Sequence, residues 1–236
     1  MKKRRGKYVI GIDPHTKRIA GKKDRAKRTI RYSVGVDEVG RGALAGPVVV
    51  AAACFPIGLK ISNRKLGALK DSKKLSPKLR ELWAKYFKSI PEISYSVGRV
   101  YPRAIEKINI SKAANRAASV ACERVIRSFQ SLQHHTNKLE FVRMFSIFLD
   151  GGLHIKNQEN FNAKTIIRAD EKITAVKIAS IIAKVKRDEY MEKLSQKHPS
   201  YGFEIHKGYG TRRHIRAIKK HGPSPVHRLT FLRKIK

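Results

Sequence analysis

The stretch 32–55 (YSVGVDEVGRGALAGPVVVAAACF) constrains the fold of this chain more than any other. Its first apolar segment runs directly into two adjacent carboxylates, Asp37 and Glu38, and the turn 40–42 (GRG) leads into a second apolar run. This order predicts two paired strands with acids and one guanidinium at the rim of a sheet. Because a fold needs no such cluster, we expect chemistry at this rim.

Two later apolar runs also deliver a carboxylate where they end. The run 144–149 is followed by Asp150, and the run 165–167 is followed shortly by Asp170. Carboxylates gathered at one rim repel each other, and a hard divalent cation relieves that repulsion. Ligation by oxygen alone suits Mg²⁺ or Mn²⁺, and two such ions can promote phosphodiester hydrolysis.

Each acid also has a structural interpretation. Asp37 can be a turn residue and Glu38 a solvated charge at the rim. Asp150 precedes two glycines and can favour a turn, and Asp170 is well placed to cap the following helix. From the residues alone, both interpretations stay open.

The charge of the chain favours a polyanionic partner. Its 236 residues include 53 Lys and Arg but 18 Asp and Glu, a formal net charge of +35. Nucleic acid is the default partner for such an excess, although an anionic membrane or a basic surface adapted for solubility also fits. The absence of an apolar run of about 18 residues or of a secretory signal predicts a cytoplasmic protein that does not span a membrane.

The remaining pattern predicts one α/β core with a basic N-terminal arm over 1–30. Helices are expected over 77–89, 111–129 and 173–194, a third strand over 93–100, and a short helix that ends near 221. Strands and helices interleave after an antiparallel start, which predicts a mixed sheet with helices on its faces. Within the arm, residues 7–13 (KYVIGID) resemble residues 31–37 (RYSVGVD), which end at Asp37. Because no second apolar strand follows Asp13, we predict that Asp13 is not a functional residue.

Two glycine-flanked side chains are suited to a sugar–phosphate. Gly40 and Gly42 let a backbone approach a ribose closely, and Arg41 between them suits phosphate. Tyr209 lies between two glycines and can stack on or beside a sugar. Each signal is weak by itself.

Together the motifs resemble the ribonuclease HII family over about 31–231. The resemblance is carried by GVDEVGRG at 35–42, AGPVV at 45–49, DSKKL at 71–75, DG at 150–151, ASIIAKVxRD at 179–188, YGF at 201–203, HKGYGT at 206–211 and HGPSPVHR at 221–228. It implies a ribonuclease H-like mixed five-stranded sheet flanked by helices. The catalytic domain would cover 31–195, and a small helical, basic C-terminal extension over 196–236 would complete the substrate site.

The resemblance also implies an activity and its residues. The activity is metal-dependent endonucleolytic cleavage of RNA in RNA–DNA hybrids and incision 5′ of ribonucleotides embedded in duplex DNA, leaving 3′-hydroxyl and 5′-phosphate ends. A monomer that uses two Mg²⁺ or Mn²⁺ ions is expected. The implied catalytic and metal-binding residues are Asp37, Glu38, Asp150 and Asp170, and the implied substrate-binding residues are Gly40, Arg41, Gly42, Lys73, Lys184 and Tyr209.

Some features depart from the family pattern. Gly152 replaces a polar residue, and Arg168-Ala169 stands before Asp170 where a glycine often precedes the acid. The sister family, ribonuclease HIII, would carry a folded N-terminal domain and usually Glu as the fourth acid. A non-catalytic RNA-binding protein and a Holliday-junction resolvase on the same fold remain alternative functions.

Overall fold

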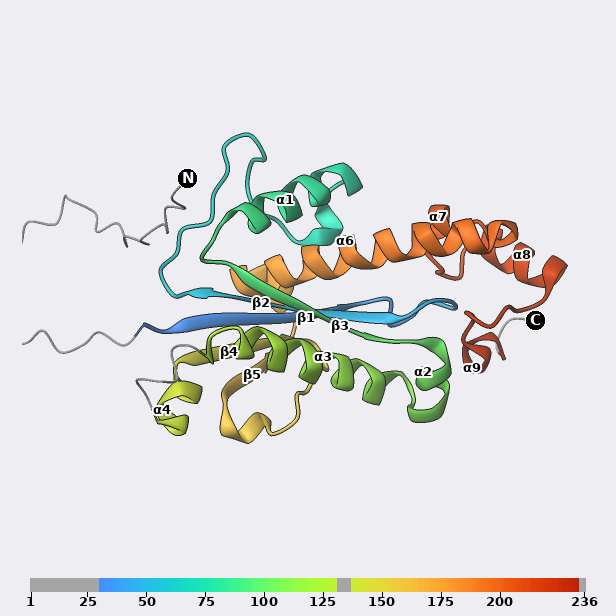
Figure 1. The fold of residues 1–236 in the computed structure, drawn as a ribbon. Helices are drawn as coiled ribbons and strands as arrows, with labels where there is room; N and C mark the ends of the chain where they lie inside the picture. Colours follow the sequence, from blue (N-terminus) through green and yellow to red (C-terminus); the bar gives the residue numbers. More distant parts are fainter. Residues whose placement is uncertain (1–29, 131–136, 234–236) are drawn as a thin grey trace, which may run out of the picture.

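A mixed five-stranded sheet forms the centre of the computed structural model, which describes residues 30–130 and 137–233 (Figure 1). The strand order is β3-β2-β1-β4-β5. The first three strands pair antiparallel, whereas β1 with β4 and β4 with β5 are parallel. The predicted mixed sheet is therefore confirmed. The strands are β1 (Tyr32–Val39), β2 (Val48–Pro56), β3 (Ser94–Val100), β4 (Phe145–Asp150) and β5 (Asn162–Ile166).

Helices cover both faces of the sheet (Figure 1). Helix α3 (Ile110–Arg127) packs on one face, and α6 (Thr174–Lys197), with α1 (Pro77–Ser89) beside it, packs on the other. Helix α1 begins as predicted, because the Ser76 side chain accepts a hydrogen bond from the Leu79 amide at 3.3 Å. The shorter helices are α2 (Pro102–Ile108), α4 (Lys138–Arg143), α5 (Ala169–Lys172), α7 (Phe203–His206), α8 (Arg212–His221) and α9 (Leu229–Leu232), with 3₁₀ turns η1 (Ser72–Lys74), η3 (Gln158–Asn160) and η4 (Pro199–Tyr201).

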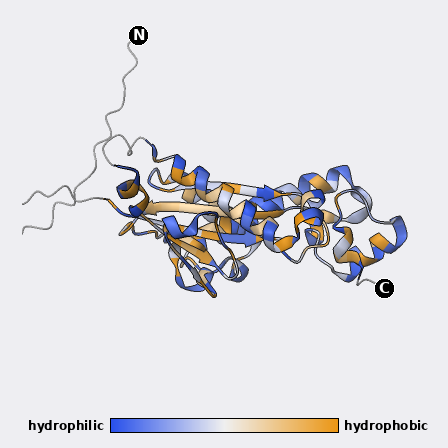
Figure 2. Ribbon diagram, turned by 90° about the horizontal axis from the view of Figure 1, so that it is seen from below, coloured by the Kyte–Doolittle hydropathy of each residue, from blue (hydrophilic) through white to orange (hydrophobic). Residues whose placement is uncertain are grey.

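The alternation of β1 divides the core into two layers. Val34 and Val36 belong to the apolar cluster on the α3 side. Gly35 faces the opposite way, where an added Cβ would lie 2.0 Å from the backbone carbon of Ala175 in α6. The absence of a side chain at Gly35 thus lets α6 lie directly against the strand that carries the acids. Figure 2 shows the matching pattern, with apolar central strands and helices that are polar on one side.

The C-terminal helices gather where α6 extends beyond the sheet (Figure 1). A third apolar cluster joins this end of α6 to the segment between β1 and β2. It includes Leu44 from that segment, Met191 from α6 and Phe203 and Ile218 from the C-terminal helices. The turn after β1 and the C-terminal segment therefore share one core.

The fourth acid is delivered differently from the prediction. Strand β5 ends at Ile166, and the chain then turns through Arg168, which has a left-handed backbone with φ of 57°. Asp170 lies in the one-turn helix α5, and Ile173 is the N-cap residue of α6. Asp170 therefore does not cap the long helix. Helix α2 was not predicted.

The predicted basic arm, with Asp13, lies outside the described residues except for its last position. Among the residues that the structure does describe, none of the helices combines the length and apolar character needed to cross a membrane.

Candidate active site

Three aspartates meet at one end of the parallel strands. The parallel register pairs Val36 with Leu149, so that Asp37 and Asp150 follow on neighbouring strands. Asp170 joins them from α5, and each of the three aspartates offers a carboxylate oxygen within 4.8 Å of the others. The sheet register and one short helix thus bring together acids that are far apart in the sequence.

Backbone and hydroxyl groups orient these carboxylates. Oδ1 of Asp37 accepts from the Glu38 amide at 2.8 Å, and the Ser180 hydroxyl of α6 lowers the pKa of Asp37 against the larger effect of burial. Oδ1 of Asp150 accepts from the Ala169 amide at 2.6 Å. Because Ala169 precedes Asp170, this hydrogen bond also fixes the start of α5 beside the end of β4.

Glu38 lies on the other side of β1, because successive side chains of a strand point to opposite faces. Its Oε1 is 3.3 Å from Nη1 of Arg41, and Nη2 of Arg41 donates to the Ser111 hydroxyl at 3.1 Å. Oε2 of Glu38 is buried and has no hydrogen-bond partner among the described residues. One oxygen of this carboxylate therefore remains available to a ligand.

Burial makes the negative charge of this cluster costly. It raises the pKa of Asp37 well above its usual range, and Glu38 and Asp150 add to that effect. Burial likewise raises the pKa of Glu38 against the opposing effect of Arg41, and the pKa of Asp150 against that of the Ala169 amide. A nearby cation would offset this cost, and a set of carboxylate oxygens suits a hard divalent ion.

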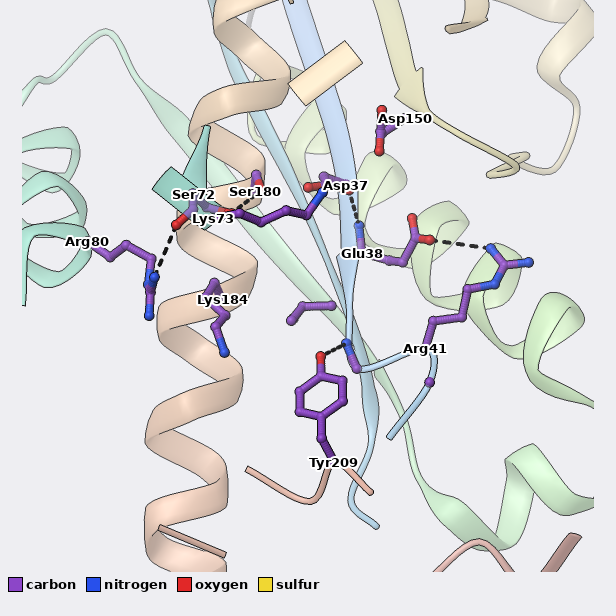
Figure 3. A pocket seen from close by; sticks show the side chains of 13 residues that line it. Asp37, Glu38, Arg41, Ser72, Lys73, Arg80, Asp150, Ser180, Lys184 and Tyr209 are labelled. Carbon is purple, nitrogen blue, oxygen red and sulfur yellow. Dashed lines mark hydrogen bonds and ion pairs between the residues drawn. The ribbon is translucent and has the colours of Figure 1, made fainter. Parts of the chain in front are cut away.

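Two of the aspartates, Asp37 and Asp150, border a cavity of about 330 Å³ (Figure 3). The sequence predicted ten site residues, and the structure places nine of them in the cavity wall: Asp37, Glu38, Gly40, Arg41, Gly42, Lys73, Asp150, Lys184 and Tyr209. The tenth, Asp170, is only 2% exposed and lies against Lys73, whose Nζ is 2.9 Å from its Oδ2. The Asp170 hydrogen bond raises the pKa of Lys73.

The glycine–arginine–glycine turn meets Tyr209 across the cavity. The Gly40 amide donates to the Tyr209 hydroxyl at 3.2 Å (Figure 3). Gly40 has a φ of 84°, and an added Cβ would lie 2.1 Å from Nε of Arg187. The Tyr209 ring lies over the guanidinium of Arg187, 5.1 Å from its centroid to Cζ. Lys184 lies nearby, with its Nζ 6.0 Å from the centroid of the Tyr209 ring.

Two fully buried arginines hold this region, and neither was among the predicted site residues. Arg187 donates to the carbonyls of Pro47, Ala45 and Lys207 at 2.9–3.2 Å. Arg228 donates twice to the Gly46 carbonyl and once to the Arg41 carbonyl. Each guanidinium thus joins the segment after β1 to the C-terminal segment. Arg187 lies in the motif at 179–188 and Arg228 in the motif at 221–228, and these motifs are the one feature of the sequence that marks them.

Other cavity residues were also missed. The hydroxyls of Ser72 and Ser180 are 2.7 Å apart, which connects η1 to α6. Arg80 donates to the Ser72 carbonyl at 3.0 Å and lies 3.9 Å from Asp188. Asp188 also accepts from Nζ of Lys184 at 2.9 Å. These contacts fix the wall that carries Lys73 and Lys184.

Comparisons with known proteins agree on one family. A family model described as ribonuclease HII matches residues 34–234. Ribonuclease HII of Caldicellulosiruptor bescii is 41% identical over 207 residues, covering 87% of this chain and 88% of that protein. The Chlamydia caviae protein of the same name is 38% identical, covering 84% of this chain and 82% of its own length.

Solved structures show the same likeness. Ribonuclease H2 from Pyrococcus horikoshii has a TM-score of 0.57 and 29% identity, covering 86% of this chain and 96% of that one. Ribonuclease HII of Archaeoglobus fulgidus, solved in complex with PCNA, has a TM-score of 0.57 and 26% identity, covering 84% and 93%. By sequence and by fold, this chain belongs to the ribonuclease HII family of endonucleases, which hydrolyse RNA in RNA–DNA hybrids.

Proposed function

We propose that this endonuclease incises duplex DNA 5′ of embedded ribonucleotides as well as cleaving RNA–DNA hybrids, and that it uses two divalent ions. The observation that carries the proposal is the position of the three aspartates. They offer oxygens within 4.8 Å of one another, and Asp37 and Asp150 border the cavity that also contains the glycine–arginine–glycine turn and Tyr209. An acid cluster beside groups suited to a ribose supports cleavage at a sugar that carries a 2′-hydroxyl.

Asp37, Asp150 and Asp170 would hold the ions, together with the free oxygen of Glu38. Divalent ions bound there supply Lewis acidity at the scissile phosphate and lower the pKa of an attacking water. The oxygen-only donor set, the raised carboxyl pKa values and the unpartnered Glu38 oxygen all support this assignment.

The chain's own cations and amides would position the nucleic acid. Arg41, Lys73 and Lys184 bring positive charge to the cavity wall, where phosphates would be neutralised. Gly40 and Gly42 let the backbone lie against the sugar, and Tyr209 would contact the ribose at the RNA–DNA junction. The net charge of +35 supports binding along the flanking duplex.

Mapped cleavage of a duplex with one embedded ribonucleotide tests this function. Reactions would contain Mg²⁺, Mn²⁺ or a chelator, with a long RNA–DNA hybrid, an all-DNA duplex and branched DNA as parallel substrates. We expect a cut 5′ of the ribonucleotide that leaves a 3′-hydroxyl and a 5′-phosphate and that requires the metal. Cleavage of the hybrid alone, or of branched DNA without ribonucleotides, would contradict the proposal.

A further inference from the structure

Three histidines are buried together beneath the loop that carries Tyr209. His214 is fully buried, and His206 and His227 are 7% and 2% exposed. The rings of His206 and His214 stack with centroids 4.3 Å apart. None of the three lines the active-site cavity. The proposed cleavage chemistry therefore has no direct use for them.

The hydrogen bonds of His227 and His214 run in one direction. The Ser224 amide can only donate, and it lies 3.0 Å from Nδ1 of His227, so the ring hydrogen of His227 is on Nε2. That Nε2 lies 3.1 Å from Nε2 of His214 and must donate to it. The hydrogen of His214 is therefore on Nδ1. This nitrogen donates to the Tyr209 carbonyl at 3.0 Å.

His206 holds the other side of the same loop. The Gly208 amide donates to its Nδ1 at 3.2 Å, so its Nε2 donates to the Tyr201 carbonyl at 2.8 Å. The backbone carbonyl of His206 accepts from the Tyr209 amide at 3.0 Å. The amide and the carbonyl of Tyr209 are thus each fixed by a group from this histidine cluster.

The chain of hydrogen bonds requires neutral rings. A second hydrogen on His214 would lie on Nε2 and face the Nε2–H of His227 across 3.1 Å, and a second hydrogen on His227 would lie on Nδ1 and face the Ser224 amide across 3.0 Å. Burial supports the neutral form, because it lowers the pKa of both rings to about 4. At neutral pH the connection from the Ser224 amide to the Tyr209 carbonyl is therefore complete.

We propose that His214 and His227 are positioning residues for Tyr209, which act through this directed chain of hydrogen bonds to its backbone carbonyl. The Tyr209 hydroxyl meets the Gly40 amide at 3.2 Å, and its ring lies over Arg187. Both contacts depend on where the Tyr209 backbone lies. The inference rests on the proposed function, in which Tyr209 contacts the ribose at the junction.

Nitrogen-15 NMR of the full-length, metal-free protein at neutral pH tests the hydrogen-bond chain directly. Long-range correlations within each imidazole report which nitrogen carries the hydrogen. We expect the hydrogen on Nδ1 in His214 and on Nε2 in His227. A charged ring at either position, or the opposite tautomer in His214, would overturn the proposal without reference to activity.

Selectivity between two substrates tests the positioning role. His214→Asn can keep an N–H donor near the position of Nδ1, whereas His214→Leu cannot. We expect the Leu variant to lower the ratio of embedded-ribonucleotide incision to long-hybrid cleavage by roughly tenfold, because a misplacement of about 1 Å can cost about a hundredfold. The Asn variant should keep most of the wild-type ratio. His221→Leu, at an exposed position of the same helix, is the control.

Equal losses on both substrates, or the same ratio in the Asn and Leu variants, would reject the positioning role. If His214→Leu does not fold, the substrate ratio of the Asn variant and the tautomers found by NMR still test the positioning role of His214. Tyr209→Ala separates this inference from the proposed function. An unchanged substrate ratio in that variant would refute Tyr209 as a junction reader, while the tautomers would still report whether the hydrogen-bond chain exists.

Discussion

The Lys73 ammonium lies 2.9 Å from a carboxylate oxygen of Asp170, and the two side chains differ sharply in exposure. The lysine side chain is 78% exposed, whereas that of the aspartate is 3% exposed. A solvent-exposed cation therefore neutralises a carboxylate that is almost completely enclosed. Such a pair adds little to stability, but it occupies an oxygen that a divalent ion would need.

Lys73→Met should therefore strengthen Mn²⁺ binding by up to about fivefold, since exposed ion pairs contribute up to about 1 kcal/mol. The same change should raise KM for nucleic acid, because the proposed contact of Lys73 with a phosphate would be lost. Calorimetric titration of the protein with Mn²⁺ alone measures the first effect, and Lys74→Met at the exposed neighbouring position is the control. Unchanged or weaker Mn²⁺ binding would show that Lys73 does not compete for the site.

Asp37→Asn should reduce cleavage to background and yet stabilise the metal-free protein. Burial raises the Asp37 pKa in the folded state, so the stability that this group contributes is full below its unfolded pKa and is lost as pH rises through the folded value. At neutral pH the uncharged Asn removes that cost. A gain of about 1 kcal/mol would raise Tm by about 2–4 °C.

Cleavage assays check the loss of activity, and thermal unfolding with and without Mg²⁺ checks the predicted change in stability. The Asn variant should also lose most of the stabilisation by the metal ion that the wild type shows. Glu171→Gln, which changes a half-buried acid next to Asp170 in α5, should keep both the cleavage and the response to metal. A lower Tm for metal-free Asp37→Asn would mean that the carboxylate is not under electrostatic strain.

Tyr209→Phe should lower incision at embedded ribonucleotides more than cleavage of long hybrids, by up to about tenfold. The change removes only the hydroxyl that meets the Gly40 amide, and a typical hydrogen bond contributes about 0.5–1.5 kcal/mol. Arg41→Ala should shift the same ratio, since Arg41 follows Gly40 in the turn. Tyr190→Phe, which changes a tyrosine outside the cavity, is the control. Parallel losses on both substrates would argue against a role in reading the junction.

The parts of the site that could be predicted are those carried by regular local patterns. Asp37 and Asp150 follow apolar residues on parallel strands, so strand register alone brings them together. Asp170 was harder, because β5 is largely exposed and a left-handed Arg168 intervenes between it and α5. The sequence therefore identified this acid but not the one-turn helix that positions it.

The supporting residues could not be predicted, because their partners are backbone groups. In the sequence, Arg187 and Arg228 cannot be distinguished from the many solvated cations of this highly positively charged chain. In the fold they are fully buried and bond to carbonyls more than a hundred positions away. His214 likewise shows its role only through the direction of its hydrogen bonds. Charge and composition carry no such information.

His214 and His227 should contribute a loss of stability as the pH falls from about 6.5 to about 4. His214 and His227 have folded pKa values of about 4, below the ordinary value of 6.5. In that window the unfolded chain takes up protons that the folded chain does not, so the free energy of unfolding falls as pH falls. The raised pKa values of Asp37 and Glu38 act in the opposite direction.

Comparison of the wild type with His214→Asn isolates the contribution of His214 to the pH dependence of the free energy of unfolding. Chemical denaturation at steps from pH 7 to pH 4.5 should give a shallower loss in the variant than in the wild type. His221→Leu, which changes an exposed ring, should keep the wild-type slope. Equal slopes in all three proteins would mean that His214 titrates normally in the folded state.

Gly35→Ala should both destabilise the protein, through a packing defect, and reduce its cleavage activity. An added Cβ would lie 2.0 Å from the Ala175 backbone carbon, and backbone cannot move aside as a flexible side chain can. The expected destabilisation is about 1–3 kcal/mol, as for overpacking elsewhere in cores. Asp37 lies on the same face of β1, and α6 supplies Ser180 and Lys184, so displacement of the helix should also reduce cleavage.

Gly152→Ala, where the nearest atom is 4.0 Å away, is the control for stability. A Gly35→Ala protein with wild-type stability and activity would show that the contact between β1 and α6 does not set the geometry of the acids.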